Sequence, residues 1–473
     1  MYRLGKFTTV EPTYFLWCWE LSTKDISCLG IRSYSRTRPC EGRYPNMHPV
    51  IFFAVYSCTM IAISASNYPP VILVPGFGGS QLQTKVGPPP SFNSLRFCDY
   101  IQWIAAHVYH NTFFDVYLKV FLLLFKPMDK CTVSALRLNY NNVTRKTTDS
   151  PQIQTRVKGF GDPYWIEWLE YTYGADWIAP LFGLNDAYYK LIAQALLKLG
   201  YKRNVSLRGA PYDFRKGPNE LQVYFEKLKD LVEYTYKING NKRVVFVTHS
   251  YGGTLSVSFL RAQTQKWKDK YMKSMISLAG VLGGTATPLK GYTRGNWITE
   301  SPEYVYRDVK VLARSFPSIA YLMPTKELWG NEVLVSRPQK NYSLSNLKEL
   351  YDDLNDPIGW EMWKDQQPYV SLEPPRVEFH CVYGTTDKDT TTEGLIYEHE
   401  YQFPDEPRIK AGPGDGTVNL RSLEYCKKWK QQQNQAVYVE HFHNVDHLGI
   451  VTNKETVDYI TKVLQGYANK IET

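Results

Sequence analysis

Residues 244–253 read VVFVTHSYGG, an apolar run that ends in a polar, glycine-containing turn. The apolar run Val244 to Val247 is typical of a buried strand in a parallel sheet. Ser250 follows in a tight turn, and the next residues, Thr254 to Leu260, have a helical pattern. A serine presented between a strand and a helix is the context of a nucleophile elbow, which exposes the hydroxyl at the end of the strand.

The strained turn of an elbow requires small residues two positions before and two positions after the serine. Gly252 meets this requirement, whereas Thr248 stands where glycine is common, a mild departure. The alternative is an ordinary strand-to-helix turn that happens to contain Ser250. The choice depends on whether partners for the serine occur further along the chain.

Other apolar runs predict further strands of the same sheet, namely Val71 to Val74, Met275 to Leu278 and Phe379 to Tyr383. Between two of them, Asp186 to Leu199 has apolar residues three and four apart, which predicts an amphipathic helix. Alternating strands and helices indicate an α/β core with a mostly parallel sheet. With 473 residues, 43% of them hydrophobic, the chain is long enough to bury a large core.

An elbow serine needs a base and an acid, which follow it in the order Ser, Asp or Glu, His. Asp415 lies in the glycine-rich segment GPGDGTVN (residues 412–419), where a plain Asp-Gly turn is the alternative. The strand-like run Val437 to His441 then leads to His447. The sequence therefore predicts a triad of Ser250, Asp415 and His447.

The histidines near the end of the chain allow a second interpretation. His441, His443, Asp446 and His447 form H-x-H-x-x-D-H, which is similar to a metallohydrolase zinc motif with one residue too many. Such a site needs further ligands, usually downstream, and no histidine follows His447. The pattern therefore favours the triad over a metal site.

The tetrahedral intermediate of acyl transfer needs two backbone N–H donors. One comes from the residue after the nucleophile, which is Tyr251. The other comes from the loop after an early strand, and VPGFGG (residues 74–79) supplies that loop with Phe77 as the donor. As an isolated feature, VPGFGG could equally be a tight turn.

An apolar segment, Val50 to Ile63, precedes the small residues 64–66 and is typical of a signal-peptide core with its cleavage site. It is short for a membrane span. We expect translation from Met47 to give the functional precursor, with residues 1–46 as an upstream extension. An uncleaved signal anchor behind a basic segment is the alternative.

Cysteines and sequons also indicate an oxidising compartment. Removal of the signal segment leaves an even set of cysteines, which suits two disulfides: Cys98, Cys131, Cys381 and Cys426. Three N-x-S/T sequons accompany them: Asn142, Asn204 and Asn341. The net charge of +9 is scattered, without a basic stripe, so it argues weakly for anionic lipid and against nucleic acid.

Two segments interrupt the alternation of strands and helices. Thr285 to Val377 shows no clear parallel strand and reads as an insertion capping the carboxyl edge of the sheet. Phe113 to Pro127 is densely apolar and aromatic between Cys98 and Cys131. The second segment is either core or a disulfide-closed loop that contacts a lipid surface.

Several blocks resemble the lecithin:cholesterol acyltransferase family, and most closely its lysosomal group XV phospholipase A2 branch. The blocks are PPVILVPGFGGSQL (69–82), RGAPYDFR (208–215), THSYGG (248–253), WKDKY (267–271), NYSL (341–344), HCVYG (380–384) and GDGTVNL (414–420). The resemblance implies an α/β-hydrolase fold with a cap and a membrane-binding subdomain.

The resemblance also implies roles for single residues. The triad falls on Ser250, Asp415 and His447, and the disulfides would pair Cys98 with Cys131 and Cys381 with Cys426. Glycosylation falls on Asn142 and Asn341. The membrane contact would come from the aromatic and apolar residues of the first disulfide loop: Phe113, Phe114, Tyr117, Leu118 and Phe121.

The implied activity is that of a phospholipase A and acyltransferase that needs neither calcium nor another cofactor. It would release a lysophospholipid at a membrane or lipoprotein surface and pass the acyl group to water or a lipid alcohol, in the lysosome or outside the cell. The alternatives are a catalytically silent lipid-binding module of the same fold and a soluble esterase.

The chain departs from the family at three places. Ile101 to Tyr109 is an insertion, Phe77 replaces an acidic residue of the lysosomal branch, and Pro413 replaces an aspartate.

The sequence predicts seven consecutive parts of the chain. They are an upstream extension (1–46), a signal-like segment (47–66), the start of the core (67–96), the membrane-binding subdomain (97–135), the core with the elbow (136–284), the cap (285–377) and the end of the core (378–473).

Overall fold

The computed structural model describes most of the chain beyond its first sixty-seven residues. The described ranges are 68–86, 114–116, 133, 135–151, 153–168, 187–294, 309–398, 403 and 407–469. All of them belong to one compact unit, Ala65–Thr473. Within these ranges no helix has the length and apolar character needed to cross a membrane.

Several sequence predictions fall outside the described residues. They are the extension 1–46, the signal-like segment 47–66, the pair Cys98 and Cys131, and the side chains of Phe113, Phe114, Tyr117, Leu118 and Phe121. Of that apolar loop, the backbone of strand β3 (Phe114–Val116) is described, and it pairs antiparallel with β2 (Leu82–Val86).

The core is a six-stranded sheet in the order β15-β12-β9-β8-β1-β7, and every neighbouring pair is parallel. The strands are β1 (Val71–Val74), β7 (Leu207–Gly209), β8 (Val244–His249), β9 (Met272–Leu278), β12 (Glu378–Thr385) and β15 (Val437–His443). All five predicted strands, including the run Val437 to His441, are confirmed, four of them with one to three extra residues at an end.

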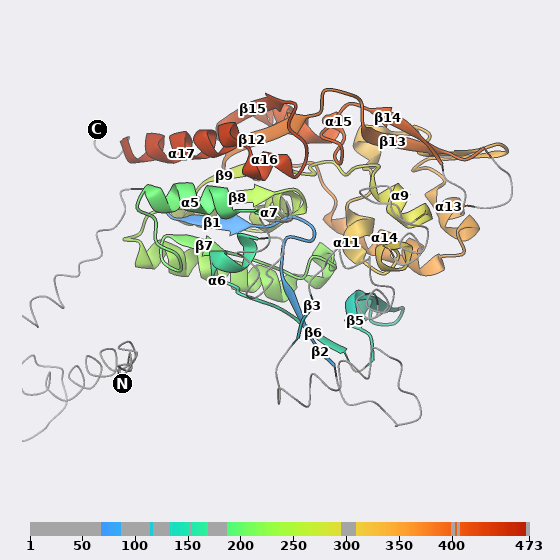
Figure 1. Ribbon diagram of the computed structural model, residues 1–473, viewed down its shortest axis with the longest axis horizontal. Coiled ribbons are helices and arrows are strands. Elements are labelled where there is room, and N and C mark those ends of the chain that lie inside the picture. The colour runs from blue at the N-terminus through green and yellow to red at the C-terminus, as the bar shows by residue number, and fades with distance from the viewer. Residues whose placement is uncertain are drawn as a thin grey trace, which may run out of the picture. The chain divides into compact units, whose positions relative to one another are not determined.

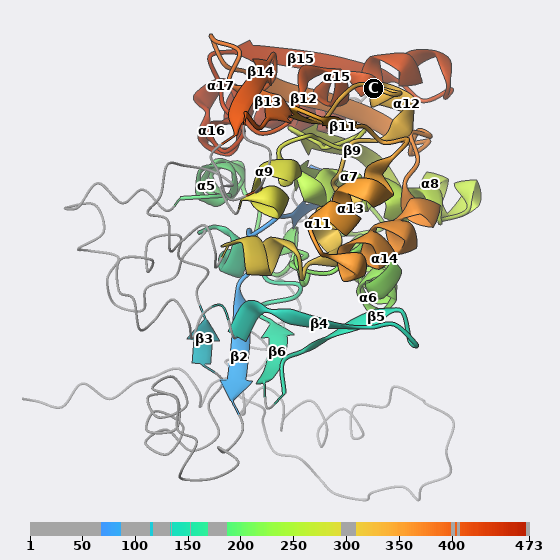
Figure 2. The ribbon, with the colours of Figure 1, turned by 90° about the vertical axis from the view of Figure 1, so that its right-hand side faces the viewer.

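Helices cover both faces of this sheet (Figures 1 and 2). On one side lie α5 (Lys190–Lys198), α16 (Gly449–Thr452) and α17 (Lys454–Asn469), which contact one another. On the other lie α6 (Gln222–Ile238), α7 (Tyr251–Arg261) and α8 (Gln265–Tyr271). This arrangement is the α/β core that the sequence predicts, and it buries both faces of the parallel strands.

Helix α5 begins four residues later than predicted, at Lys190. The backbone N–H groups of Tyr188 and Lys190 donate to the carbonyl of Glu167 instead of continuing a helix. Ala187 also forms a β-bridge with Trp168. Tertiary hydrogen bonds thus override the helical pattern in front of α5 and leave Tyr188 in a turn.

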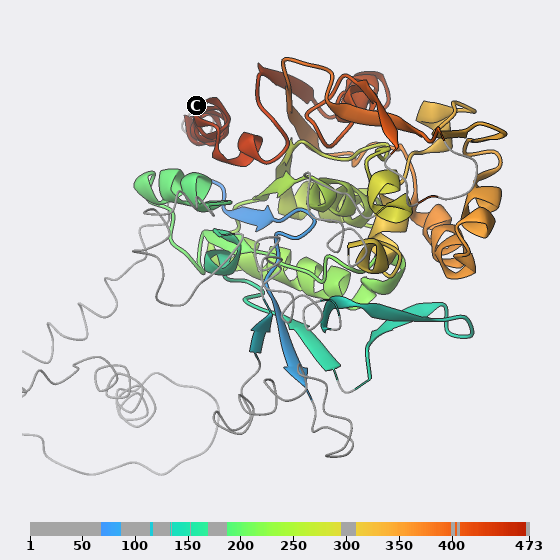
Figure 3. The same cartoon turned by 45° about the vertical axis from the view of Figure 1, so that its right-hand side comes forward.

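The described part of the segment after Gly284 is mainly helical, and Figure 3 shows its helices in yellow and orange. Its elements are α9 (Pro288–Thr293), α11 (Pro317–Tyr321), α12 (Lys326–Trp329), β10 (Val335–Arg337), β11 (Lys340–Tyr342), α13 (Leu347–Asp353) and α14 (Pro357–Gln366). We refer to these elements together as the cap.

The expectation that residues 285–377 hold no parallel strand is wrong. Strand β10 pairs in parallel with β13 (Thr391–Ile396), in a second sheet of order β11-β10-β13-β14 whose last strand is Arg408–Gly412. A three-residue strand with one fully buried side chain, Val335, is too short to give a periodic signal. The second sheet therefore joins the cap to the chain segment that precedes Asp415.

A β-hairpin also contacts the cap, through helix α14. Strands β4 (Leu138–Asn141) and β5 (Lys146–Asp149) pair antiparallel. The Tyr140 hydroxyl donates to Asp365 of α14 at 2.6 Å, and Arg145 forms ion pairs with Glu361 and Asp365. The third sheet, β3-β2-β6, is completed by β6 (Ile153–Val157).

Candidate active site

Ser250 occupies the turn between β8 and α7 in a strained conformation. Its φ is 54° and its ψ is −126°, a region that residues other than glycine rarely occupy. The backbone N–H of Ser250 donates to the carbonyl of Leu278 on β9, which holds the turn in place. The strand, the strained serine and the helix form a nucleophile elbow, and with the parallel sheet they make the fold an α/β-hydrolase.

The positions two residues before and two residues after Ser250 have different surroundings. A Cβ atom on Gly252 would lie 2.1 Å from the carbonyl oxygen of Pro75, because the start of α7 approaches the end of β1 closely. Thr248 is fully buried in β8 beside Val74 of β1. Glycine is thus sterically required two residues after the serine, whereas the threonine side chain two residues before it is accommodated in the core.

We expect Gly252→Ala to destabilise the protein by about 3 kcal/mol, because overpacking against a backbone atom forces α7 away from β1. The matched control is Gly466→Ala in α17, where a Cβ would meet no atom within 4 Å. That change should raise stability by about 0.5 kcal/mol through helix propensity. Thermal unfolding of both variants checks the contrast, and equal unfolding temperatures would contradict the close approach.

Asp415 is buried in the glycine-rich turn that follows β14. Its Oδ1 accepts the backbone N–H groups of Thr417 at 3.0 Å and Val418 at 2.7 Å. Its Oδ2 lies 2.7 Å from Nδ1 of His447. Two backbone donors therefore fix one oxygen of the carboxylate and aim the other at the imidazole.

His447 lies in the loop between β15 and α16 and is also buried. Its backbone N–H donates to the carbonyl of Asp415 at 3.0 Å. Because the carboxylate accepts the proton on Nδ1, Nε2 is left as an acceptor, and it lies 2.9 Å from the Oγ of Ser250. This geometry lets the imidazole take the proton of a hydroxyl that attacks a carbonyl carbon.

The four residues of the zinc-like motif contact different partners. Nε2 of His441 lies 2.8 Å from the Thr385 hydroxyl, and the rings of His441 and His443 lie side by side with centroids 4.3 Å apart. Oδ1 of Asp446 accepts the backbone N–H of Gly449. His447 turns away from this pair toward Asp415 and Ser250.

The predicted oxyanion donors lie on backbone segments beside Ser250, since Tyr251 follows it in the chain and a Cβ atom on Gly76, next to Phe77, would lie 2.9 Å from the Cβ of Ser250. Phe77 follows β1, and its ring packs edge-on against Phe214 with centroids 5.0 Å apart. Tyr251 is the first residue of α7, and its buried hydroxyl donates to the carbonyl of Lys216. The β1–β8 pairing, Val74 with Thr248, brings the two segments together at the same edge of the sheet.

The sequence model of the family described as "Lecithin:cholesterol acyltransferase" matches residues 113–370 and 360–454. The chain belongs to the lecithin:cholesterol acyltransferase family. It is an enzyme of this family.

Several named relatives match this chain over almost their whole length. The "Lysosomal phospholipase A and acyltransferase" of Rattus norvegicus is 34% identical over 407 residues, which cover 85% of this chain and 92% of the relative. The Homo sapiens protein of the same name is 33% identical and covers 86% and 92%. The "Phosphatidylcholine-sterol acyltransferase" of Gallus gallus is 33% identical and covers 83% and 89%.

Solved structures with a related fold are much more distant in sequence. A chain of the Tle4-Tli4 complex is 11% identical with a TM-score of 0.44, covering 84% of this chain and 98% of that one. The Bacillus licheniformis lipase BlEst2 is 14% identical with a TM-score of 0.29, covering 58% and 83%.

Asn419, which the sequence did not single out, connects the cap to the turn that carries Asp415. Asn419 is fully buried, and its Oδ1 accepts the backbone N–H of Ala286 at 3.0 Å and the Thr285 hydroxyl at 2.9 Å. Its Nδ2 donates to the carbonyl of Thr392 at 2.9 Å. The only available signal was its place in the GDGTVNL block.

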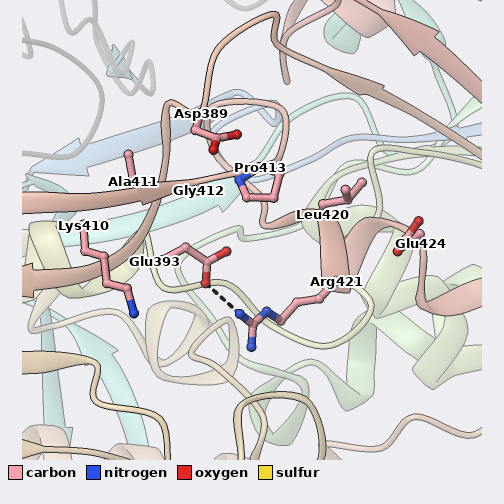
Figure 4. A pocket seen from close by; sticks show the side chains of 9 residues that line it. All are labelled: Asp389, Glu393, Lys410, Ala411, Gly412, Pro413, Leu420, Arg421 and Glu424. Atoms are coloured by element: carbon pink, nitrogen blue, oxygen red, sulfur yellow. Dashed lines mark hydrogen bonds and ion pairs between the residues drawn. The ribbon is translucent and has the colours of Figure 1, made fainter.

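A cavity of about 430 Å³ borders the turn that carries Asp415 (Figure 4). Its lining carries charges of both signs, including Lys410, Asp389 and an ion pair of 3.1 Å between Arg421 and Glu393. None of the three triad residues lines it. A lining of this character does not suit an acyl chain, which requires apolar walls.

Proposed function

We propose that this enzyme is a phospholipase A and O-acyltransferase that works through an acyl group carried on Ser250. The observation that supports it best is the unbroken hydrogen-bonded chain from Asp415 through His447 to Ser250, at the end of β8 in a member of this family. The glycerophospholipid substrate is supported by the names of the relatives, which include a "Lysosomal phospholipase A and acyltransferase" and a "Phosphatidylcholine-sterol acyltransferase".

In the first half of the reaction, Oγ of Ser250 attacks the ester carbonyl while Nε2 of His447 takes the hydroxyl proton. The backbone N–H groups of Phe77 and Tyr251 are the proposed donors to the oxyanion. Collapse of the intermediate breaks the bond to the leaving alcohol, which receives the proton from His447. A lysophospholipid departs and the acyl group stays on the serine.

In the second half, an acceptor hydroxyl gives its proton to His447 and attacks the carbonyl carbon of the acyl-serine. The bond between that carbon and Oγ of Ser250 breaks, and His447 returns the proton to Oγ. The acceptor is water in hydrolysis and a lipid alcohol in transfer. The strands β10 and β13 and the side chain of Asn419 tie the cap to the Asp415 turn. We propose that the cap selects the acceptor by controlling how much water reaches Ser250.

The enzyme acts in the lysosome or outside the cell. The disulfide between Cys381 and Cys426 joins β12 to the short 3-10 helix Tyr425–Gln431, as suits an oxidising compartment. Asn142, Asn204 and Asn341 are all exposed, which supports their proposed glycosylation. The pairing of Cys98 with Cys131 and the membrane contact through residues 113–121 remain predictions.

The proposal is tested with vesicles of mixed phospholipids that contain a lipid alcohol with a free primary hydroxyl. The folded, glycosylated enzyme should release lysophospholipid and fatty acid and also produce the acylated alcohol, which mass spectrometry of the extracted lipids measures. Removal of the alcohol should shift the acyl group entirely to fatty acid, without lowering lysophospholipid release by more than about twofold, if acylation limits the rate.

The opposing hypothesis is a lipid-binding protein with no activity. The matched control is the same protein sample incubated with vesicles whose phospholipids carry ether-linked chains, which it can bind but not deacylate. Vesicle binding without lysophospholipid release from ester lipids at any pH between about 4 and 8 would establish the silent lipid-binding protein and overturn the proposal.

A further inference from the structure

His249, the residue before the nucleophile, is a buried titratable group that the proposed mechanism does not use. Its Nδ1 lies 2.7 Å from the hydroxyl of Tyr188, and its Nε2 lies 2.9 Å from the backbone carbonyl oxygen of His447. Its ring also packs against the ring of His447, with centroids 4.9 Å apart. The side chain thus contacts the loop that carries the proposed general base.

These contacts determine which atoms carry protons. A carbonyl oxygen only accepts, so Nε2 of His249 must donate to the carbonyl of His447. In a neutral ring Nδ1 is then an acceptor, and the Tyr188 hydroxyl donates to it. The Tyr188 oxygen in turn accepts the backbone N–H of Gly76 at 2.8 Å. Every group in this chain of hydrogen bonds is satisfied.

The surroundings keep both side chains in these protonation states. Burial, followed by the proximity of His447, lowers the pKa of His249 well below its usual value of 6.5. Burial also raises the pKa of the Tyr188 hydroxyl. His249 therefore stays neutral and Tyr188 stays protonated, so the direction of the hydrogen bonds is fixed.

Each end of the chain of hydrogen bonds reaches a proposed catalytic segment. Gly76 precedes Phe77, and a Cβ atom at Gly76 would lie 2.9 Å from Nδ1 of His249, so the oxyanion loop rests directly on this imidazole. At the other end, the backbone of His447 is held on both sides. Its N–H donates to Asp415 and its carbonyl accepts from His249.

We propose that His249 and Tyr188 are positioning residues that couple the oxyanion loop to the loop of the general base. They hold the backbone at Gly76 and at His447 at a fixed separation around Ser250, so that the oxyanion donors and Nε2 of His447 are aligned together. The inference rests on the proposed function, because it assumes that Ser250 is acylated with His447 as the base.

The test measures the reaction of Ser250 with a soluble fluorophosphonate, which needs no membrane. Oγ of Ser250 bonds to phosphorus, fluoride leaves, and His447 takes the hydroxyl proton. We compare Tyr188→Phe with Tyr189→Phe. Tyr189 is equally buried, and its hydroxyl donates to carbonyls of β1 and β8 instead of joining these two loops. Both variants lose one buried hydroxyl, so both should lose similar stability.

Tyr188→Phe should react about 10- to 100-fold more slowly per reactive site, whereas Tyr189→Phe should stay within about twofold of the wild type. The rate per reactive site does not depend on the folded fraction, so a merely structural role leaves it unchanged. With a soluble p-nitrophenyl ester, the loss in Tyr188→Phe should appear in kcat, with KM within about threefold.

A second pair of variants covers the case in which Tyr188→Phe does not fold. His249→Gln keeps an N–H donor within reach of the His447 carbonyl, whereas His249→Leu does not. His249→Gln should react at least about fivefold faster than His249→Leu.

The possible results distinguish the positioning role of His249 and Tyr188 from the proposed function of the enzyme. Variants with wild-type rates at a labelled Ser250, or equal rates for His249→Gln and His249→Leu, would overturn the positioning role alone. Failure of the wild type to label Ser250 while it still deacylates phospholipid would overturn the proposed function, and this inference with it.

Discussion

Replacing Ser250 with alanine should reduce acyl release from phospholipid vesicles roughly a millionfold, to the background of the assay. The Ser250 hydroxyl lies 2.9 Å from Nε2 of His447, and its removal leaves the proposed base without a proton to accept from a nucleophile. The strained turn is fixed by the backbone hydrogen bond to Leu278, which the substitution does not touch. The variant should therefore fold normally, which circular dichroism checks.

The matched control is Ser256→Ala. Ser256 lies on the same helix α7 and is buried, and its Oγ has no hydrogen-bond partner within the described ranges. Removal of that hydroxyl should leave activity within about twofold of the wild type. Equal losses in the two variants would mean that damage to α7, and not loss of the nucleophile, explains the effect.

Replacing Asp415 with asparagine should lower kcat about 10⁴-fold. The amide oxygen can still accept the N–H groups of Thr417 and Val418, so the turn should keep its shape. The amide nitrogen then faces Nδ1 of His447 as a donor and forces the imidazole proton onto Nε2. In that tautomer His447 cannot accept the proton of Ser250.

Asp446→Asn is the matched control for this change. Asp446 precedes His447, is exposed, and accepts the N–H of Gly449 through an oxygen that asparagine also supplies. Steady-state rates of Asp446→Asn should remain within about threefold of the wild type. A loss in Asp415→Asn that is no larger than in Asp446→Asn would argue against Asp415 as the residue that orients the base.

The predicted triad could be read from the sequence because each member has a local signature. Ser250 lies between an apolar strand and a helix, Asp415 lies in a glycine-rich turn, and His447 follows a strand, in the chain order of this fold. The buried parallel strands were also predictable, because an apolar run needs no tertiary information to be recognised.

The remaining features depend on contacts between distant segments. Tyr188 lies 61 residues before His249, and its place in front of α5 depends on the Glu167 carbonyl, which no periodic pattern reveals. Asn419 has a defined role only once Ala286 and Thr392 are brought beside it. The short strand β10 is likewise defined by its partner β13.

The proposed acyl-enzyme mechanism is tested by identifying the residue that carries the acyl group. The enzyme is mixed with phospholipid vesicles, quenched in acid during the first turnover, digested and analysed by mass spectrometry. We expect a peptide that bears one fatty acyl group on Ser250 and loses it when a lipid alcohol is added before the quench. Rapid lysophospholipid release from an enzyme whose Ser250 stays unmodified at every time point, or whose acyl group lies on another residue, would contradict it.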